Sequence, residues 1–245
     1  MKQIILLISL ILTVSFSAMS LDDIVSKAEK QMRGDTSYMK MSLVIKTKRW
    51  TRTIKMESWA EGTAKSFLKI NYPRKDKGVT FLKLKTDMWQ YVPKIERTIK
   101  YPPSMMLQSW MGTDFSNDDL VKESSIVDDY TKKLLGEDLE SYTIELIPKE
   151  DAAVTWGKIV EYIDKTTLLP VWAKFYDEDN ELIRTFRYEK VVKLSDRYFP
   201  TRWVIEPASE DKKDNRTTLI VEEMIFDKAL PKDIFTLKAL KRRAR

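Results

Sequence analysis

The sequence predicts a mainly β protein with short α-helices, built as one antiparallel sheet or barrel of about 10 to 11 strands. Three observations predict it. Apolar and polar residues alternate in many short segments, polar turns separate these segments, and strands do not alternate with long helices as they do in a doubly wound fold. No linker rich in Pro, Gly or Ser divides the chain, so residues 21–245 are expected to form a single domain.

The first twenty residues have the pattern of a secretory signal peptide. Lys2 gives a positive start, residues 4–16 are almost wholly apolar, and small residues at Ser17, Ala18 and Ser20 predict cleavage near Ser20. The apolar run is shorter than the roughly 20 residues that cross a membrane, which disfavours the alternative of an uncleaved anchor. This region has no Cys to carry a lipid, so we expect a soluble protein released into the periplasm.

Composition removes several kinds of chemistry. The chain has no His and no Cys, which excludes a His general base, Ser-His-Asp and Cys-His arrangements and His/Cys zinc sites. Carboxylate pairs and Ser-Lys pairs remain possible, but no G-x-S-x-G motif is present. We therefore expect a protein that is not an enzyme and has no cofactor or metal. Without Lys2 the chain has 42 basic and 37 acidic residues, a dispersed net charge of +5 that does not predict nucleic-acid binding.

The mature chain is expected to begin with a helix at residues 22–33, ended by Gly34. The first strand then follows, since Met39, Met41, Leu43 and Ile45 alternate with polar or less apolar neighbours. Further strands are predicted at residues 52–60, 67–71, 79–84, 88–92, 97–101, 142–147, 156–164, 171–176, 182–192, 198–205 and 217–226.

The strand pattern breaks between Pro102 and Gly136. A segment rich in Met and Trp at residues 105–111 predicts two or three helical turns, ended by Gly112. Ser116 is expected to cap a second short helix. The acidic residues in its first turn stabilise a helix N-terminus, and we interpret them in this way rather than as catalytic or metal-binding groups. A weaker helical stretch is predicted at residues 128–135.

Residues 88–120 carry a long and unusual motif. It comprises Trp89, Tyr91, Pro93, Arg97, Ser109-Trp110-Met111-Gly112, Asp114-Phe115 and Asn117-Asp118-Asp119-Leu120, with Pro231-Lys232-Asp233-Ile234-Phe235 near the end of the chain. In these residues the sequence resembles the outer-membrane lipoprotein-sorting protein family, the LolA-like proteins. The resemblance implies an unclosed barrel with a helical lid, which shields acyl chains while lipoproteins pass from an inner-membrane transporter to an outer-membrane acceptor.

This resemblance and the composition of the segment predict an apolar binding site. Shielding hydrocarbon gains about 0.8 kcal/mol per buried methylene, and Met side chains adapt to different ligand shapes. The predicted cavity and lid residues are Trp89, Tyr91, Met105, Met106, Leu107, Trp110, Met111, Phe115, Met39, Met41, Leu43, Ile54 and Met56. Arg97 is a candidate contact to a lipid headgroup or to the lid. The alternatives are ordinary core packing for the apolar residues and a simple surface position for Arg97.

The sequence therefore predicts a periplasmic carrier of a lipid or lipoprotein acyl chain, acting in outer-membrane biogenesis with only transient membrane contact. Its resemblance is to the broader branch of the family, whose members look like partners of RND-type inner-membrane exporters. The alternative is thus a periplasmic adaptor of such an exporter, which binds protein rather than lipid. A third hypothesis, an enzyme acting on lipids, lacks a nucleophile motif.

Overall fold

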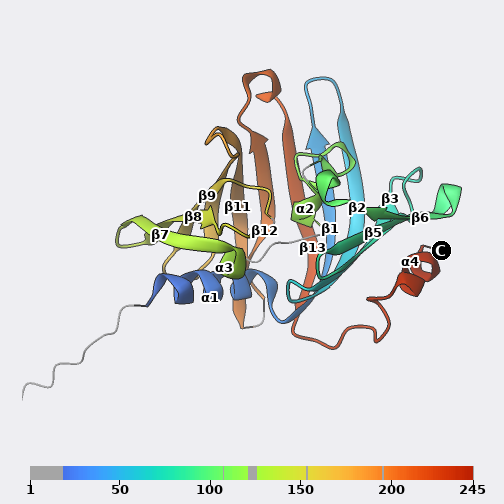
Figure 1. Ribbon diagram of the computed structural model, residues 1–245, viewed down its shortest axis with the longest axis horizontal. Helices are drawn as coiled ribbons and strands as arrows, with labels where there is room; N and C mark the ends of the chain where they lie inside the picture. The colour runs from blue at the N-terminus through green and yellow to red at the C-terminus, as the bar shows by residue number, and fades with distance from the viewer. Residues whose placement is uncertain (1–18, 107, 121–125, 153, 195, 245) are drawn as a thin grey trace, which may run out of the picture.

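The alternating segments of the sequence assemble into one antiparallel sheet in the computed structural model, which describes residues 19–106, 108–120, 126–152, 154–194 and 196–244 (Figure 1). Within these residues the sheet has thirteen strands. They are β1 Thr36–Lys46, β2 Thr51–Glu61, β3 Lys65–Tyr72, β4 Thr80–Leu84, β5 Asp87–Val92, β6 Arg97–Tyr101, β7 Tyr130–Glu137, β8 Ser141–Pro148, β9 Lys158–Asp164, β10 Pro170–Tyr176, β11 Leu182–Leu194, β12 Arg197–Pro207 and β13 Arg216–Phe226.

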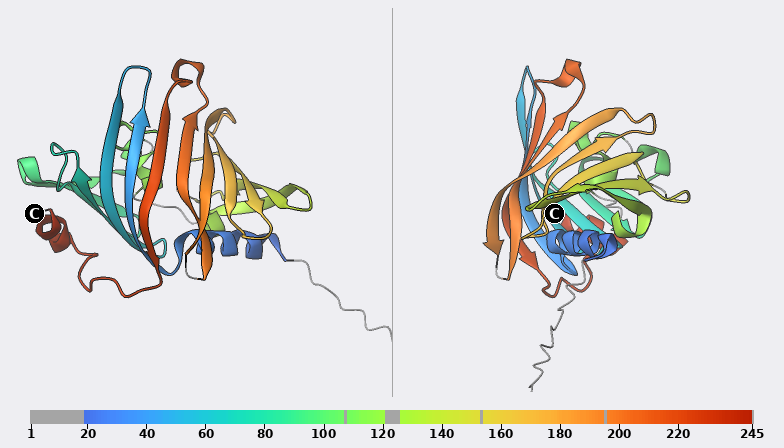
Figure 2. Two further views of the ribbon diagram at one scale, coloured as in Figure 1. Left: turned by 180° about the vertical axis from the view of Figure 1, so that it is seen from behind. Right: turned by 90° about the vertical axis from the view of Figure 1, so that its left-hand side faces the viewer.

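The order of the strands is simple except at one place. From one edge to the other it runs β6-β5-β4-β3-β2-β1-β13-β12-β11-β10-β9-β8-β7. Every pair of neighbours in the sheet is thus consecutive in sequence except β1 and β13, and the consecutive strands β6 and β7 lie at opposite edges. Strands β1 and β13 pair through ten residues, from Ser37 opposite Phe226 to Lys46 opposite Arg216. The edge strands β6 and β7 are not paired with each other, and the sheet curls without closing (Figure 2). This confirms the predicted unclosed antiparallel barrel.

The helices lie on both faces of this sheet. They are α1 Leu21–Arg33, α2 Asn117–Leu120, α3 Ile126–Asp129 and α4 Leu237–Arg243, with short 3-10 turns at Pro93–Ile95, Pro103–Met105, Trp110–Gly112 and Glu210–Lys212. The inner, concave face carries α1 and the residues before and within α2, and here lies the main core. The outer face carries α4, which packs on β4 and β5 over a second cluster that includes Trp59, Phe67 and Leu82. No helix within the described residues is long and apolar enough to cross a membrane.

The first helix forms where local sequence signals agree. Ser20 caps α1 by accepting a hydrogen bond from the backbone N–H of Asp23, and acidic residues occupy the first turn. Gly34 ends the helix with φ of 69° and donates its N–H to the carbonyl of Lys30. Ile24, Val25 and Ala28 form its buried stripe against the sheet. The predicted helix at residues 22–33 is confirmed.

Two predictions about the segment between β6 and β8 are wrong in detail. Of the helix predicted at residues 128–135, only Asp128 and Asp129 are helical, as the end of α3, because Tyr130–Glu137 forms the edge strand β7, paired with β8 and bulged between Leu134 and Gly136. β7 is the one strand of the thirteen that has no counterpart among the predicted ranges. The described residues of the Met-rich stretch form 3-10 turns rather than an α-helix, with Met111 at φ of 50°. Ser116 does cap α2, since its hydroxyl accepts from the N–H of Asp119. Leu107 and the predicted signal peptide up to Ala18 lie outside the described residues.

Candidate functional site

A cavity of about 200 Å³ lies between α1 and the half of the sheet that contains β9 to β12. Helix α1 supplies Val25, Ala28, Glu29, Met32 and Arg33 to its lining. The sheet and its loops supply Ile159, Glu161, Pro170, Phe175, Phe186, Tyr188, Trp203, Trp156 and Tyr130, and the remaining contributors are Phe115, Asp119 and Ile126. For comparison, a dry apolar cavity of about 150 Å³ accepts benzene. The cavity therefore has room for a ring or a short piece of hydrocarbon chain.

Aromatic side chains make up much of the wall. Phe175 lies with its ring centroid 5.2 Å from that of Trp156 and 4.8 Å from that of Phe186, and Tyr188 continues the row to Trp203 at 5.7 Å. The row follows from the alternation of β10, β11 and β12, whose inward positions carry these rings. Such a wall presents a broad apolar surface to a ligand without demanding one shape.

A buried ion pair connects this wall to residues 108–120, hereafter the cover segment. Arg184 on β11 donates a hydrogen bond of 2.6 Å to each carboxylate oxygen of Asp119, and another of 2.9 Å to the carbonyl of Asp114. Its guanidinium lies over the rings of Trp156 and Phe175, at 4.2 and 4.7 Å from their centroids. The Arg184 and Asp119 side chains are 4% and 13% exposed, so each charge is balanced chiefly by the other, and the Ser116 backbone N–H also donates to Asp119 at 2.6 Å.

Two more contacts hold the cover segment over the sheet. Arg52 on β2 donates to the carbonyl of Met111 at 3.0 Å, and the Thr217 hydroxyl on β13 donates to the Asp114 carboxylate at 2.6 Å. Trp110 lies beneath, fully buried against Phe81 at 5.6 Å between ring centroids. The cover segment is thus attached by a small number of polar contacts to strands on both sides of the β1–β13 pair.

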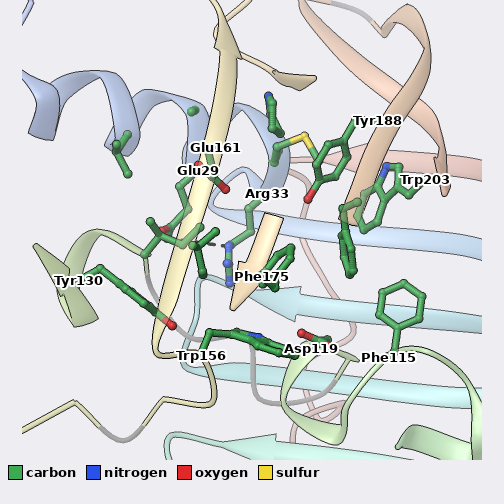
Figure 3. A pocket seen from close by; sticks show the side chains of 17 residues that line it. Glu29, Arg33, Phe115, Asp119, Tyr130, Trp156, Glu161, Phe175, Tyr188 and Trp203 are labelled. Carbon is green, nitrogen blue, oxygen red and sulfur yellow. Dashed lines mark ion pairs between the residues drawn. The ribbon is translucent and has the colours of Figure 1, made fainter. Parts of the chain in front are cut away.

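Three charged side chains from α1 and β9 point toward the cavity (Figure 3). Glu29 and Arg33 form an ion pair at 4.0 Å, and Glu29 also accepts from the backbone N–H of Val127 at 3.3 Å. Glu161 occupies an inward position of β9 between Ile159 and Ile163 and is only 7% exposed. Burial, assisted by the nearby Glu29 carboxylate, raises the pKa of Glu161 to about 7. The cavity is therefore apolar with one charged corner.

Comparison with solved structures identifies the fold. The chain superposes on a DUF1329 family protein from Desulfovibrio piger with a TM-score of 0.81 at 21% identity, covering 89% of this chain and 97% of the other. It matches a putative outer membrane lipoprotein-sorting protein domain from Vibrio parahaemolyticus with a TM-score of 0.78 at 20% identity, covering 90% and 98%. A LolA superfamily protein from Nitrosomonas europaea gives 0.77 at 23% identity, covering 91% and 100%. At these identities the likeness shows a shared fold, that of the LolA-like proteins.

Sequence comparison adds the family. A family model described as "-like: Uncharacterized protein" matches residues 62–242, which is well over half of the chain. The chain belongs to the family of this model. None of the curated proteins matches it in sequence. The resemblance inferred from residues 88–120 is confirmed at the level of the fold.

The structure places most of the predicted site residues in this LolA-like protein's packed core rather than at the cavity. Met41, Leu43, Ile54, Met56, Met106 and Trp110 are buried in the main cluster, with Met39 and Met111 packed against it, and Met105 is half-buried. They fill the concave space over β1 to β4. Among the predicted residues that the structure describes, Phe115 alone lines the cavity. The core-packing alternative thus describes the present position of these side chains, because they occupy the space that a ligand would need.

Three predicted residues lie elsewhere. Trp89 and Tyr91 belong to the cluster on the outer face under α4, since they alternate along β5 with Met88, which points into the main core. Lys100 lies over the Trp89 ring at 5.5 Å. Arg97 is exposed at the start of the edge strand β6. These positions separate all three from the cavity.

The charged residues of the cavity are absent from the predicted set, although the sequence carries a signal for Glu161, which lines the cavity, and for Arg184, which pairs with the lining residue Asp119. Glu161 stands between Ile159 and Ile163, and Arg184 between Leu182 and Phe186, so each is a charged residue on the apolar side of a strand. A charge in that position is rarely buried unless it is paired or functional. The contribution of α1 has no such signal, since its buried stripe is that of any amphipathic helix.

Proposed function

We propose that this LolA-like protein is a periplasmic carrier that holds part of an acyl chain in the cavity between α1 and strands β9 to β12. The observation that supports the proposal is the apolar, largely aromatic cavity of about 200 Å³ that lies under a helix, α1, and beside the cover segment. The shared fold of the Vibrio parahaemolyticus domain, which is named as a putative outer membrane lipoprotein-sorting protein, supports the same proposal. In this proposal an inner-membrane transporter supplies the cargo, an outer-membrane acceptor receives it, and the protein catalyses no reaction.

The size of the cavity indicates how cargo enters. About 200 Å³ is below the range of roughly 300 to 1,000 Å³ that is usual for drug-sized ligands, so a whole acyl chain requires more space. The boundary most able to supply it is the cover segment with α1, because the sheet itself is held by continuous strand pairing. We expect these parts to move outward on loading, with each added buried methylene contributing about 0.8 kcal/mol.

The proposal is tested by loading and quenching. The protein is purified from a bacterial envelope fraction, extracted with organic solvent, and the extract is analysed by mass spectrometry. In parallel, a fatty acid with a bromine-labelled chain is titrated in, because Trp156 and Trp203 line the cavity and their emission reports contact. We expect co-purified lipid, quenching, and loss of most of the quenching in a variant with both Trp156→Phe and Trp203→Phe.

A matched pair of helix variants locates the ligand. Ala28→Leu fills the cavity from α1 and is expected to weaken binding about tenfold, equivalent to ~1.4 kcal/mol. Ser26→Leu makes a similar enlargement on the exposed side of the same helix and should leave binding unchanged. Absence of both lipid and quenching, or equal effects of the two variants, argues against the carrier. An exporter subunit recovered without lipid would favour the adaptor alternative.

A further inference from the structure

Glu161 is a carboxyl group that lines the cavity without a partner. Its residue is 93% removed from solvent, and it makes no hydrogen bond or ion pair with any residue in the described part of the chain. Buried carboxylates are normally paired or well supplied with donors, because an isolated buried charge is expensive. A leucine or isoleucine at this inward position would continue the apolar face of β9. A glutamate at this position therefore carries a desolvation cost that no contact in the described part of the chain offsets.

The charges around Glu161 leave it as the one carboxyl in excess. On the elements packed against it, Glu29 and Arg33 of α1 pair with each other, and Asp119 of α2 pairs with Arg184 of β11. Three carboxyls thus face two guanidinium groups, and the difference of one is Glu161. A cation that enters the cavity meets an uncompensated acid. An anion meets Arg33 and Arg184, each of which already has a carboxylate beside it.

The aromatic wall adds to this preference. Phe175, Phe186, Tyr188 and Trp203 are lined up along the same cavity, and the faces of such rings attract cations, most strongly when water is excluded. Arg184 already shows the tendency, since its guanidinium lies 4.2 to 4.7 Å from three of the ring centroids. An unpaired carboxyl beside aromatic faces is a suitable setting for an organic ammonium group.

We propose that Glu161 is the recognition point for a primary ammonium group borne by the apolar ligand. The inference rests on the carrier function proposed above and narrows its cargo to molecules with an amine next to hydrocarbon. The raised pKa of Glu161 is consistent with it, because an ammonium partner would stabilise the ionised carboxylate that the empty cavity disfavours. Such chemistry occurs in an ethanolamine lipid headgroup and in the free amino terminus of an acylated protein.

The test compares three small molecules that share one chain. Hexylamine, hexan-1-ol and hexanoate are titrated by calorimetry at about pH 8, where the amine is protonated and Glu161 is ionised. We expect hexylamine to bind about tenfold more tightly than hexan-1-ol, and hexanoate to bind least. Glu161→Gln should reduce hexylamine affinity to that of hexan-1-ol, which itself changes little. Glu178→Gln, at an exposed turn, is the charge-matched control and should change neither.

The outcomes separate the inference from the carrier function. If hexan-1-ol binds and hexylamine is not favoured, or if Glu161→Gln leaves hexylamine affinity unchanged, the ammonium site is refuted and the carrier stands. If none of the three binds, both fail. Should Glu161→Gln not fold, the wild type still decides the question, because hexylamine affinity must rise as the pH increases through about 7 while hexan-1-ol affinity stays flat.

A second comparison distinguishes the two sources of the amine. Dihexanoyl phosphatidylethanolamine and S-hexylcysteine amide are each titrated beside their N-acetyl forms, which lack the positive charge. Weakening by acetylation of the first assigns the site to a lipid headgroup, and weakening of the second assigns it to an acylated amino terminus. Acetylation that weakens neither overturns the proposal.

Discussion

Arg184 donates hydrogen bonds to both carboxylate oxygens of Asp119, and this ion pair joins the aromatic wall of the cavity to the cover segment. The arginine comes from the sheet and the aspartate from α2, 65 residues earlier in the chain. Its planar guanidinium is also stacked among aromatic rings, a position that lysine cannot reproduce. This bidentate contact is therefore the one ion pair among the described contacts that hold the cover segment on the sheet, beside the hydrogen bonds of Arg52 and of the Thr217 hydroxyl.

Asp119→Asn tests this ion pair. The change leaves the Arg184 charge buried without its counter-ion, for which a destabilisation of about 3 to 5 kcal/mol is expected. Urea denaturation measures the loss, and hydrogen exchange at residues 109–117 should speed up more than exchange in β1. Glu61→Gln is the control, since it breaks the exposed pair with Lys65 and should cost less than about 1 kcal/mol. Equal costs for the two variants would contradict the role assigned to the buried pair.

Glu161 gives the protein a pH-dependent stability of defined sign. Its pKa is raised from 4.5 to about 7 by burial, so the native state binds its proton more tightly than the unfolded chain does. Its contribution is fully present below about pH 4.5 and is lost as the pH rises through about 7. At pH 8 we expect Glu161→Gln to be more stable than the wild type by on the order of 3 kcal/mol, and near pH 4 the two should converge. A thermal melt at each pH provides the comparison, and a constant gap would refute the assignment.

Gly78 positions the C-terminal helix. It has φ of 84°, and a Cβ there would meet the carbonyl oxygen of Ala244 and the ring of Pro93. We expect Gly78→Ala to destabilise α4 and to expose Leu240, detected as faster proteolysis at Lys241 or Arg242. Gly62→Ala shares a positive φ but has open space, so it should show only the backbone cost of about 1 to 2 kcal/mol. A Gly78→Ala protein whose helix stays as protected as that of Gly62→Ala would show that the contact is unimportant.

Met56 distinguishes core from cavity. It is fully buried on β2 and does not line the cavity, so Met56→Ala is expected to lower the free energy of unfolding by about 2 to 5 kcal/mol. Quenching by the bromine-labelled fatty acid should be unaffected in the folded variant. If quenching is lost while the fold is retained, the ligand occupies the half of the barrel over β1 to β4, as the sequence predicted, and the cavity assignment is incorrect.

The strands of this protein were predictable where one face is buried and the other is not. Met41, Leu43 and Ile45 point inward on β1 at the spacing that the sequence shows. The edge strand β7 was not predictable in the same way, because Lys132, Lys133, Leu134 and Leu135 favour helices and have no alternation. Pairing with β8 overrides this local preference, as tertiary contacts often do for strands.

The site was harder to predict than the fold because it depends on which elements meet. Trp89 and Met88 are both apolar, and only the presence of α4 on the outer face explains why β5 needs apolar residues on each side. Similarly, the sequence predicts that Trp110 belongs to the cover segment, but it does not show that the Trp110 side chain is fully buried in the core under that segment. The cavity lies between α1 and strands β9 to β12, and no local sequence pattern determines how closely that helix packs on those strands.

The pairing of β1 with β13 has a consequence for how the chain reaches its native state. Because β13 is the last strand made and sits in the middle of the sheet, β1 keeps a bare hydrogen-bonding edge until nearly the whole polypeptide has been synthesised. Contacts between residues some 180 positions apart form slowly, since a long loop must close first. A ribosome-bound or truncated fragment that ends before Arg216 would therefore expose the unpaired edge of β1. Such fragments are expected to bind a chaperone or to aggregate.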